Sequence, residues 1–316
     1  MTPRLDFILA VLVLGVGACG SGDAPTALRD PRGVILVVDG DRHSQIYAMR
    51  PDGSEIRQLT HNNVMNTDPA LSPDGTQIAF ISLVDSIPGF PARRPDVYVM
   101  NVDGSGVRRL YASPNTSWHP TWSPDGKHIA FTSVDPAIGD FRVYVMNSDG
   151  SNVHVVGNAP RGSFDPEWFP DGTRLLFLSN RSPRNWWTMY TMNVDGTGER
   201  QLAGDNACNT NLGGARLSPD GNRIAYHCGS AGLYIIGADG AGTGIHVDTS
   251  IPANGSADGK PVWSPAGDQL AFSSNRESTF QQSINHVYTV AITGGVPTKI
   301  TRDSRGWYPD TWGIVR

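Results

Sequence analysis

The chain has 316 residues, enough for two average domains or for one large all-β domain. Its 36 glycines and 23 prolines are scattered along the sequence, which favours many turns and few long helices. The formal net charge of −5 argues against a surface that follows nucleic-acid phosphates over the whole molecule, so we expect no nucleic-acid partner.

The first residues have the pattern of an export signal. Arg4 precedes an apolar stretch at positions 7–16, which is too short to span a bilayer but has the length of a signal-peptide core. The sequence Val-Gly-Ala-Cys at positions 16–19 resembles the bacterial lipobox, in which the cysteine is lipidated and becomes the new N-terminus. The alternative is an ordinary secretory signal followed by an incidental cysteine.

The lipobox resemblance implies a signal peptide at 1–18, a lipidated Cys19 with a flexible linker through residue 32, and one domain at 33–316. The acyl chains would anchor the protein to a membrane of the cell envelope, facing the periplasm or the exterior. Gly20 after the cysteine, in place of an aspartate, favours the outer membrane. No later segment of the sequence is apolar enough to span a membrane.

A four-residue turn, Ser-Pro-Asp-Gly or a close variant, recurs through the rest of the chain. Proline has the φ that the second position of a type I turn needs, and glycine permits the positive φ at which the chain leaves the turn. A short apolar run follows each copy. The copies are Ser72–Gly75, Ser123–Gly126, Phe169–Gly172, Ser218–Gly221 and Ser264–Gly267.

A second turn alternates with the first and is spelled Asp-Gly in five copies and Gly-Gly in the last. A strand with a central tyrosine precedes each copy, as at Val97-Tyr98 and Val143-Tyr144. Both turns suit hairpins, so each repeat of about 45 to 55 residues holds four short strands, named A to D in chain order. A four-stranded unit at this period is a propeller blade.

The two ends of the chain supply complementary parts of one blade. Strand Val34–Val38 resembles a B strand but has no A strand before it, and Tyr308–Ile314 resembles an A strand with no B strand after it. Pairing these two segments closes the ring and removes its open sheet edges. The sequence therefore predicts an all-β, six-bladed propeller whose first blade contains strands from both termini.

The repeat resembles that of TolB-type β-propellers over nearly the whole chain after residue 33. The Trp-Ser-Pro-Asp-Gly core of that family is intact at Trp122–Gly126. Its first position is Leu71, Trp168, Leu217 and Trp263 in the other copies. The resemblance implies a protein partner in the envelope, such as a peptidoglycan-associated lipoprotein.

The two ends of the propeller differ in regularity. The A–B and C–D turns share one end and vary little between copies, whereas the B–C and D–A connections share the other and vary widely in length. Irregular loops on a rigid scaffold are where binding usually occurs. Aromatic and arginine residues in these connections suit a protein-binding surface, and the alternative is that the rings are buried between blades. The predicted binding residues are Phe90, Arg93, Arg94, Trp118, Phe164, Arg184, Trp186, Trp187 and Trp307.

One residue at the start of each A strand, usually before a proline, is expected to surround the axial channel. The six positions are Asp68, His119, Asp165, Gly214, Lys260 and Tyr308. The first three come from consecutive blades and could hold a metal or a polar ligand, or they could cap strand starts and bind channel water. We expect no resident metal or cofactor.

Cys208 and Cys228 are the two cysteines left after the lipobox, and both are expected on the irregular side of blade 5. In an exported protein they could form a disulfide that clips a long loop, or remain buried free thiols.

The sequence contains no Gly-x-Ser-x-Gly elbow, no P-loop and no His-Glu-x-x-His motif. The leading hypothesis is a non-enzymatic, monomeric binding module that docks a protein or cell-wall-associated partner through its irregular face. The alternative is a polysaccharide hydrolase or metal-assisted lyase with its site in the axial channel.

Overall fold

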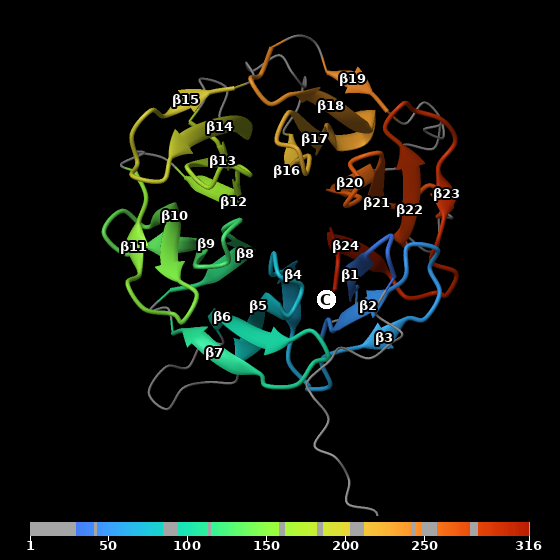
Figure 1. The fold of residues 1–316 in the computed structure, drawn as a ribbon, viewed down its shortest axis with the longest axis horizontal. Helices are drawn as coiled ribbons and strands as arrows, with labels where there is room; N and C mark the ends of the chain where they lie inside the picture. The colour runs from blue at the N-terminus through green and yellow to red at the C-terminus, as the bar shows by residue number, and fades with distance from the viewer. Residues whose placement is uncertain are drawn as a thin grey trace, which may run out of the picture.

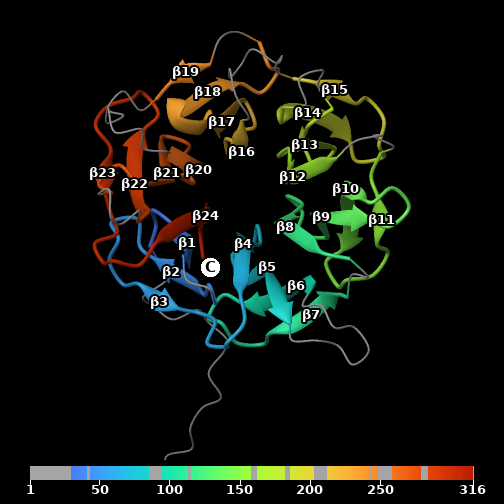
Figure 2. The same cartoon turned by 180° about the vertical axis from the view of Figure 1, so that it is seen from behind.

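A computed structural model describes residues 30–40, 43–84, 94–112, 115–157, 162–181, 186–202, 212–241, 244–247, 258–278 and 284–315. Six antiparallel sheets of four strands stand around a central axis, with the inner strand of each sheet next to that axis (Figures 1 and 2). Within these residues the one helical element is a 3-10 turn at Gly229–Ala231, and no helix is long and apolar enough to cross a membrane. The predicted six-bladed propeller is confirmed.

The strands of each blade run from the axis outward, and the outermost is short. Blade 1 contains β24 (Trp307–Gly313), β1 (Val34–Asp39), β2 (Ile46–Met49) and β3 (Arg57–Gln58), and blade 2 contains β4 (Asn66–Leu71), β5 (Gln77–Val84), β6 (Arg94–Asn101) and β7 (Arg108–Tyr111). Blade 3 contains β8 (Ser117–Trp122), β9 (His128–Asp135), β10 (Asp140–Asn147) and β11 (His154–Val155). Blade 4 contains β12 (Ser163–Trp168), β13 (Arg174–Ser179), β14 (Thr188–Asn193) and β15 (Arg200–Gln201). Blade 5 contains β16 (Gly213–Leu217), β17 (Arg223–His227), β18 (Leu233–Gly237) and β19 (Ile245–His246), and blade 6 contains β20 (Asp258–Trp263), β21 (Gln269–Ser274), β22 (His286–Ala291) and β23 (Thr298–Lys299).

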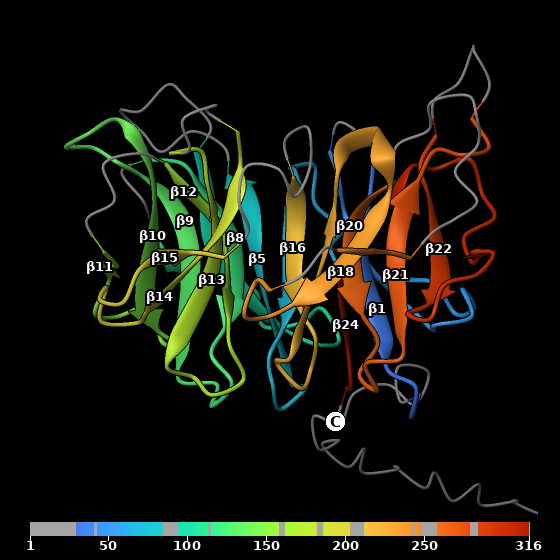
Figure 3. The ribbon, with the colours of Figure 1, turned by 90° about the horizontal axis from the view of Figure 1, so that it is seen from above.

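Blade 1 is closed by the predicted pairing of the two ends of the chain. Strand β24 lies antiparallel to β1, with Val34 opposite Gly313 and Asp39 opposite Trp307. The Trp312 indole N–H donates a hydrogen bond of 2.8 Å to the Arg32 carbonyl oxygen. The side view in Figure 3 places the C-terminus at one end of the ring, the end that carries the A–B and C–D turns.

A pair of aromatic rings recurs in the cores of blades 2 to 6, tilted in blade 2 and stacked in the other four. Strand B supplies Phe80, Phe131, Phe177, Tyr226 or Phe272, and the tyrosine of strand C lies opposite with ring centroids 5.7–5.9 Å apart. Blade 1 has Val37 at this strand B position, paired with Tyr47. Trp307 of β24 contacts Tyr47 instead, edge to face at 4.9 Å, and is 0% exposed. The closing strand therefore supplies the ring that blade 1 lacks.

The glycines of the two turns have different surroundings. Each Ser-Pro-Asp-Gly turn closes on itself, as in the 2.9 Å bond from the Gly75 amide to the Ser72 carbonyl. The Asp-Gly turns press against the preceding blade: a Cβ at Gly240 would lie 2.0 Å from the Leu202 carbonyl oxygen. Gly126 of the first turn has nothing within 4 Å of such a Cβ. The second turn is therefore a contact between blades as well as a hairpin.

We expect Gly240→Ala to destabilise the propeller more than Gly126→Ala. Both glycines have positive φ, 77° and 68°, so both variants carry a left-handed penalty of about 1–2 kcal/mol. Only Gly240→Ala also drives a methyl group into neighbouring backbone, which should add at least about 1 kcal/mol. Thermal unfolding followed by circular dichroism measures the difference, and equal melting temperatures would contradict the assigned packing.

Deleting residues 307–316 should abolish cooperative unfolding or lower the melting temperature sharply. The truncated chain loses β24 as the partner of β1 and exposes both the Tyr47 ring and an unpaired sheet edge. Removal of Arg316 alone is the control and should leave the melting temperature unchanged. A truncated chain that melts like the full chain would show that the ring does not depend on β24.

Candidate functional site

Four half-buried aromatic side chains form a contiguous cluster at the irregular end of blades 3 and 4. We call Trp118, Phe141, Phe164 and Trp187 the aromatic cluster. The rings of Trp118 and Phe141 meet edge to face at 5.4 Å. Phe164 lies 5.5 Å from Phe141 and 5.6 Å from Trp187, again between ring centroids. Because none of these rings is fully covered, the cluster presents apolar surface beside the channel mouth.

The sequence-predicted binding residues do not all share this surface. Trp118, Phe164 and Trp187 belong to the aromatic cluster. Trp186, which directly precedes Trp187 in the sequence, is half-buried. Arg94 is the first residue of β6 and is half-buried. Phe90, Arg93 and Arg184 lie outside the described residues.

The predicted set of binding residues wrongly includes Trp307 and omits Phe141. Trp307 is fully buried: besides its contact with Tyr47, its indole N–H donates a 2.6 Å hydrogen bond to Asp303. It therefore offers no surface to a partner. Phe141 was missed because it falls inside a strand and not in a loop. Strand β10 begins three residues before the buried Val143 and so reaches the irregular end.

The channel residues are held in a costly backbone conformation. Asp68, His119, Asp165 and Lys260 have φ of 52°, 50°, 55° and 47°, and Gly214 has 56° at the same point of blade 5. A left-handed residue other than glycine costs roughly 1–2 kcal/mol. Each lies in a β-bulge where the A strand has one more residue than the B strand beside it, as between Trp118 and Thr121. The bulge turns the side chain toward the axis.

In blade 1 the bulge falls at Asp310 rather than at Tyr308. Pro309 pairs with Val37 and Thr311 with Leu36, so Asp310 is the extra residue and its side chain lines the channel. The Tyr308 hydroxyl instead accepts a 2.7 Å hydrogen bond from the Asn285 amide. Tyr308 therefore does not line the channel cavity.

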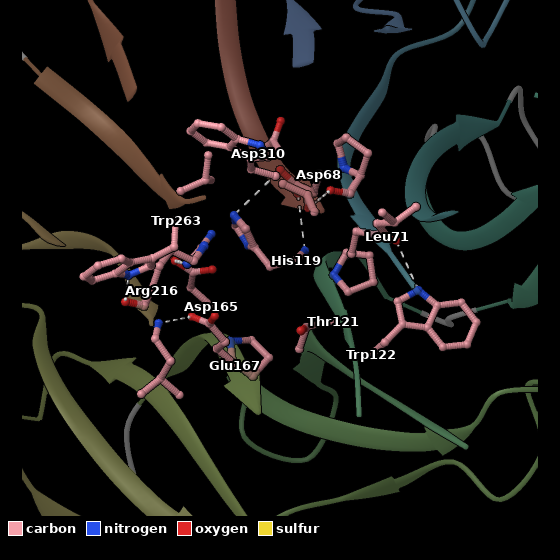
Figure 4. A pocket seen from close by; sticks show the side chains of 18 of the residues that line it. Asp68, Leu71, His119, Thr121, Trp122, Asp165, Glu167, Arg216, Trp263 and Asp310 are labelled. Carbon is pink, nitrogen blue, oxygen red and sulfur yellow. Dashed lines mark hydrogen bonds and ion pairs between the residues drawn. The ribbon is translucent and has the colours of Figure 1, made fainter. Parts of the chain in front are cut away.

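Opposite charges join the inner strands across the channel (Figure 4). The Lys260 ammonium nitrogen lies 3.1 Å from Asp310 Oδ1 and 3.7 Å from Asp68 Oδ1. His119 Nε2 is 3.8 Å from the same Asp68 oxygen. On the other side, Arg216 Nη1 lies 2.9 Å from Asp165 Oδ2. These contacts link blades 6, 1, 2 and 3 in one group and blades 4 and 5 in another.

Two charged residues of the channel, Glu167 and Arg216, were missed by the sequence analysis. They lie two residues beyond the bulge position on β12 and β16, where alternation returns side chains to the axis. Glu167 Oε2 accepts a 3.0 Å bond from the Leu217 amide. Toward the regular end the cavity is lined by apolar side chains and reaches Pro73 and Pro219 of the A–B turns. The apolar lining residues are Leu71, Trp122, Leu217, Trp263 and Trp312.

Burial raises the pKa values of the carboxyl groups in the channel, and neighbouring cations lower them. Burial opposes ionisation of Asp68, but His119 and Lys260 outweigh it and lower the pKa of that carboxyl. Arg216 likewise outweighs burial and lowers the pKa of Asp165. Burial prevails at Asp310, whose pKa is raised, and at Glu167, whose pKa is raised to about 7. Within the described residues no group of three His, Cys, Asp or Glu side chains is placed to hold a metal ion.

Cys228 directly follows β17 and is 2% exposed and disulfide-bonded. Cys208 lies outside the described residues, so their pairing stays a prediction.

Glu167→Gln should become increasingly stabilising as pH rises from about 4.5 to 7. The folded protein holds the Glu167 proton more tightly than the unfolded chain does, so ionisation in this window costs the wild type stability, by at most about 3 kcal/mol. Denaturant unfolding at pH 4.5, 6 and 8 measures the trend. Glu277→Gln should show the opposite trend, because its hydrogen bond from Lys299 lowers the pKa of Glu277. A pH-independent difference for Glu167→Gln would contradict the assigned environment.

Comparison with known proteins gives matches to TolB-type propellers. A family profile described as the TolB beta propeller domain (PD40) matches residues 140–312, more than half of the chain. The Tol-Pal system protein TolB of Alcanivorax borkumensis is 30% identical over 102 residues, covering 31% of this chain and 22% of that protein. A TolB homolog of Chlorobium luteolum is 32% identical over 136 residues, covering 32% of this chain and 31% of that protein. The match thus spans less than a third of either relative.

Solved structures show the same fold at low identity. The crystal structure of TolB from Acinetobacter baumannii superposes with a TM-score of 0.68 at 18% identity, covering 89% of this chain and 66% of that one. A putative TolB from Agrobacterium tumefaciens gives a TM-score of 0.66 at 18% identity, covering 89% and 91% of the two chains. The profile match over more than half of the chain shows that the chain belongs to the TolB-type β-propeller family.

Proposed function

We propose that this propeller is a non-enzymatic binding module of the bacterial cell envelope, which docks a protein or cell-wall-associated partner through its irregular face. The observation that carries the proposal is the aromatic cluster, because half-exposed tryptophan and phenylalanine rings on a rigid scaffold are typical of interaction hot spots. Membership in the TolB-type family supports a binding role in the envelope.

The partner is proposed to be a protein of the kind that the relatives' names suggest. One of them is named as part of a Tol-Pal system, and a peptidoglycan-associated lipoprotein is the first partner to test. The monomeric propeller would reach this partner from a lipid anchor on Cys19, with the outer membrane as the proposed site.

The described chain begins at Asp30, on the side of the ring opposite the aromatic cluster. Arg32 pairs with Asp52 at 3.1 Å, and Asp52 belongs to the C–D turn of blade 1 at the regular end. The chain before residue 30 is thus joined to the end of the ring opposite the aromatic cluster.

The double variant Trp118→Ala, Trp187→Ala should lose partner retention at least about tenfold, since truncated hot-spot aromatics cost more than about 1.4 kcal/mol. Tagged full-length chain would be cross-linked in envelopes and the retained proteins quantified by mass spectrometry. The dissociation constant of the purified partner would then be measured with both chains.

The matched control is Ile245→Ala, which removes a 68% exposed apolar side chain from β19 at the outer edge of blade 5. It should retain the partner fully. If the double variant, shown to be folded by circular dichroism, binds the purified partner as tightly as the control does, the proposed docking face is wrong.

A further inference from the structure

A groove lies between blades 3 and 4 at the regular end of the ring. It is lined by the A–B turns of both blades, Ser123–Gly126 and Phe169–Gly172, and has a volume of about 520 Å³. Trp168, the last residue of β12, and the imidazoles of His128 and His154 also line it. Among the described residues, the groove and the axial cavity have no lining residue in common. The groove is therefore a separate surface, distant from both the channel and the aromatic cluster.

An arginine fills the corresponding position between blades 5 and 6. Arg223 is the first residue of β17, and its guanidinium carbon lies 5.0 Å from the ring centroid of Trp263 in the next blade. Its Nη2 donates a 3.1 Å hydrogen bond to the Gly267 carbonyl oxygen, in the A–B turn of that blade. A tryptophan ring and a turn carbonyl thus form a binding place for a guanidinium, which is planar and carries several donors.

Blades 3 and 4 have the same tryptophan and the same turn but not the arginine. Trp168 and Gly172 occupy the corresponding positions of blade 4, and His128 occupies the position of the arginine. The His128 ring centroid is 6.3 Å from that of Trp168, and in the part of the chain that the structure describes its side chain makes no hydrogen bond to blade 4. A Cβ at Gly172 would have one described atom within 4 Å, in Pro124. The shorter imidazole therefore leaves open the space that arginine fills two blades further on.

The tryptophan of this groove also lacks a hydrogen bond that its counterparts make. The indoles of Trp122 and Trp263 donate bonds of 3.1 and 2.9 Å to backbone carbonyls of the preceding blade. The Trp312 indole bonds instead to the carbonyl of Arg32, in the segment before β1. The Trp168 indole nitrogen is buried and has no partner among the described residues, which is costly for a donor. Neighbouring atoms cover this nitrogen, so a carbonyl from outside reaches it only after a side chain shifts.

The charges at the groove are complementary to a cation. Asp125 and Asp171 line it, and Asp195 directly follows another lining residue in the C–D turn of blade 4. Arg174 pairs with Asp171 at 2.8 Å, and the Lys127 ammonium nitrogen is 3.9 Å from Asp125. Asp195 has no ion pair within the described residues. Three carboxylates therefore share two cations, and the remaining negative charge favours a positively charged ligand.

We propose that the groove between blades 3 and 4 binds an arginine in an extended segment of a second protein. The guanidinium lies on the Trp168 ring and donates to the Gly172 carbonyl, as Arg223 does with the corresponding groups of blade 6. A backbone carbonyl of the segment accepts from the Trp168 indole. Lysine suits the site less, because its ammonium group has no planar face to lay on the ring. Because this groove and the aromatic cluster lie at opposite ends of the ring, the propeller would bind two proteins at once.

The test uses the full-length chain in detergent with ¹⁵N-labelled tryptophan, and the indole signal of Trp168, identified by its loss in Trp168→Phe, reports binding. The probe is the peptide N-acetyl-Pro-Arg-Gly amide, which has the sequence of residues 31–33. The control ligand is the same peptide with citrulline, a neutral near-isostere, in place of arginine. The arginine peptide should shift the Trp168 signal with about millimolar affinity, and the citrulline peptide should bind at least about tenfold more weakly.

Two variants test the assigned groups. His128→Arg supplies the missing guanidinium from within the chain and should weaken binding of the arginine peptide at least about tenfold. Asp125→Asn removes one of the carboxylates and should weaken it at least about threefold. The matched control is Gln77→Arg, the same kind of change at the first residue of β5 in blade 2, which should leave the affinity unchanged.

Equal binding of the arginine and citrulline peptides would overturn the inference. So would an unchanged affinity for the arginine peptide in His128→Arg or, if that variant does not fold, in Asp125→Asn. These outcomes are distinct from failure of the docking function, because partner retention through Trp118 and Trp187 is measured at the other end of the ring.

Discussion

The antiparallel pairing of β24 with β1 joins residues almost 280 positions apart, and six residue pairs make up this seam. Every other blade is built from consecutive strands, so its hairpins can form locally. Blade 1 can form only when both ends of the chain meet. The seam also places Trp307 against Tyr47 and Asp310 beside Lys260, so the core of blade 1 and the charges of the channel both depend on it.

The repeated turns made the fold predictable because each turn is a local event with a distinct chemical requirement. Proline, aspartate and glycine at fixed spacing favour a hairpin turn, and five copies at one period leave few alternatives to a propeller. The blade count followed from two unpaired segments at the ends. None of this needed knowledge of how the blades pack.

The site was less predictable because it depends on offsets of one or two residues and on contacts between blades. The bulge of blade 1 falls two residues later than predicted, at Asp310 instead of Tyr308. Trp307 looked like a loop aromatic, and only the absence of a phenylalanine at Val37 explains its burial. Arg216 and Glu167 carry no local motif, since their role arises from alternation along strands that meet at the axis. Non-local geometry of this kind leaves no pattern in a single sequence.

The two ends of the folded chain nearly touch: a Cβ added to Gly33 would lie 2.7 Å from the carbonyl oxygen of Gly313. A short peptide linking them would turn the seam into an ordinary hairpin loop. The chain could then be cut at an A–B turn of another blade, such as Ser123–Gly126, and the circular permutant would keep the same ring and the same channel. Blade 1 is therefore special only in where the backbone is interrupted. The position of the break, unlike the closure itself, is not a physical requirement of the fold.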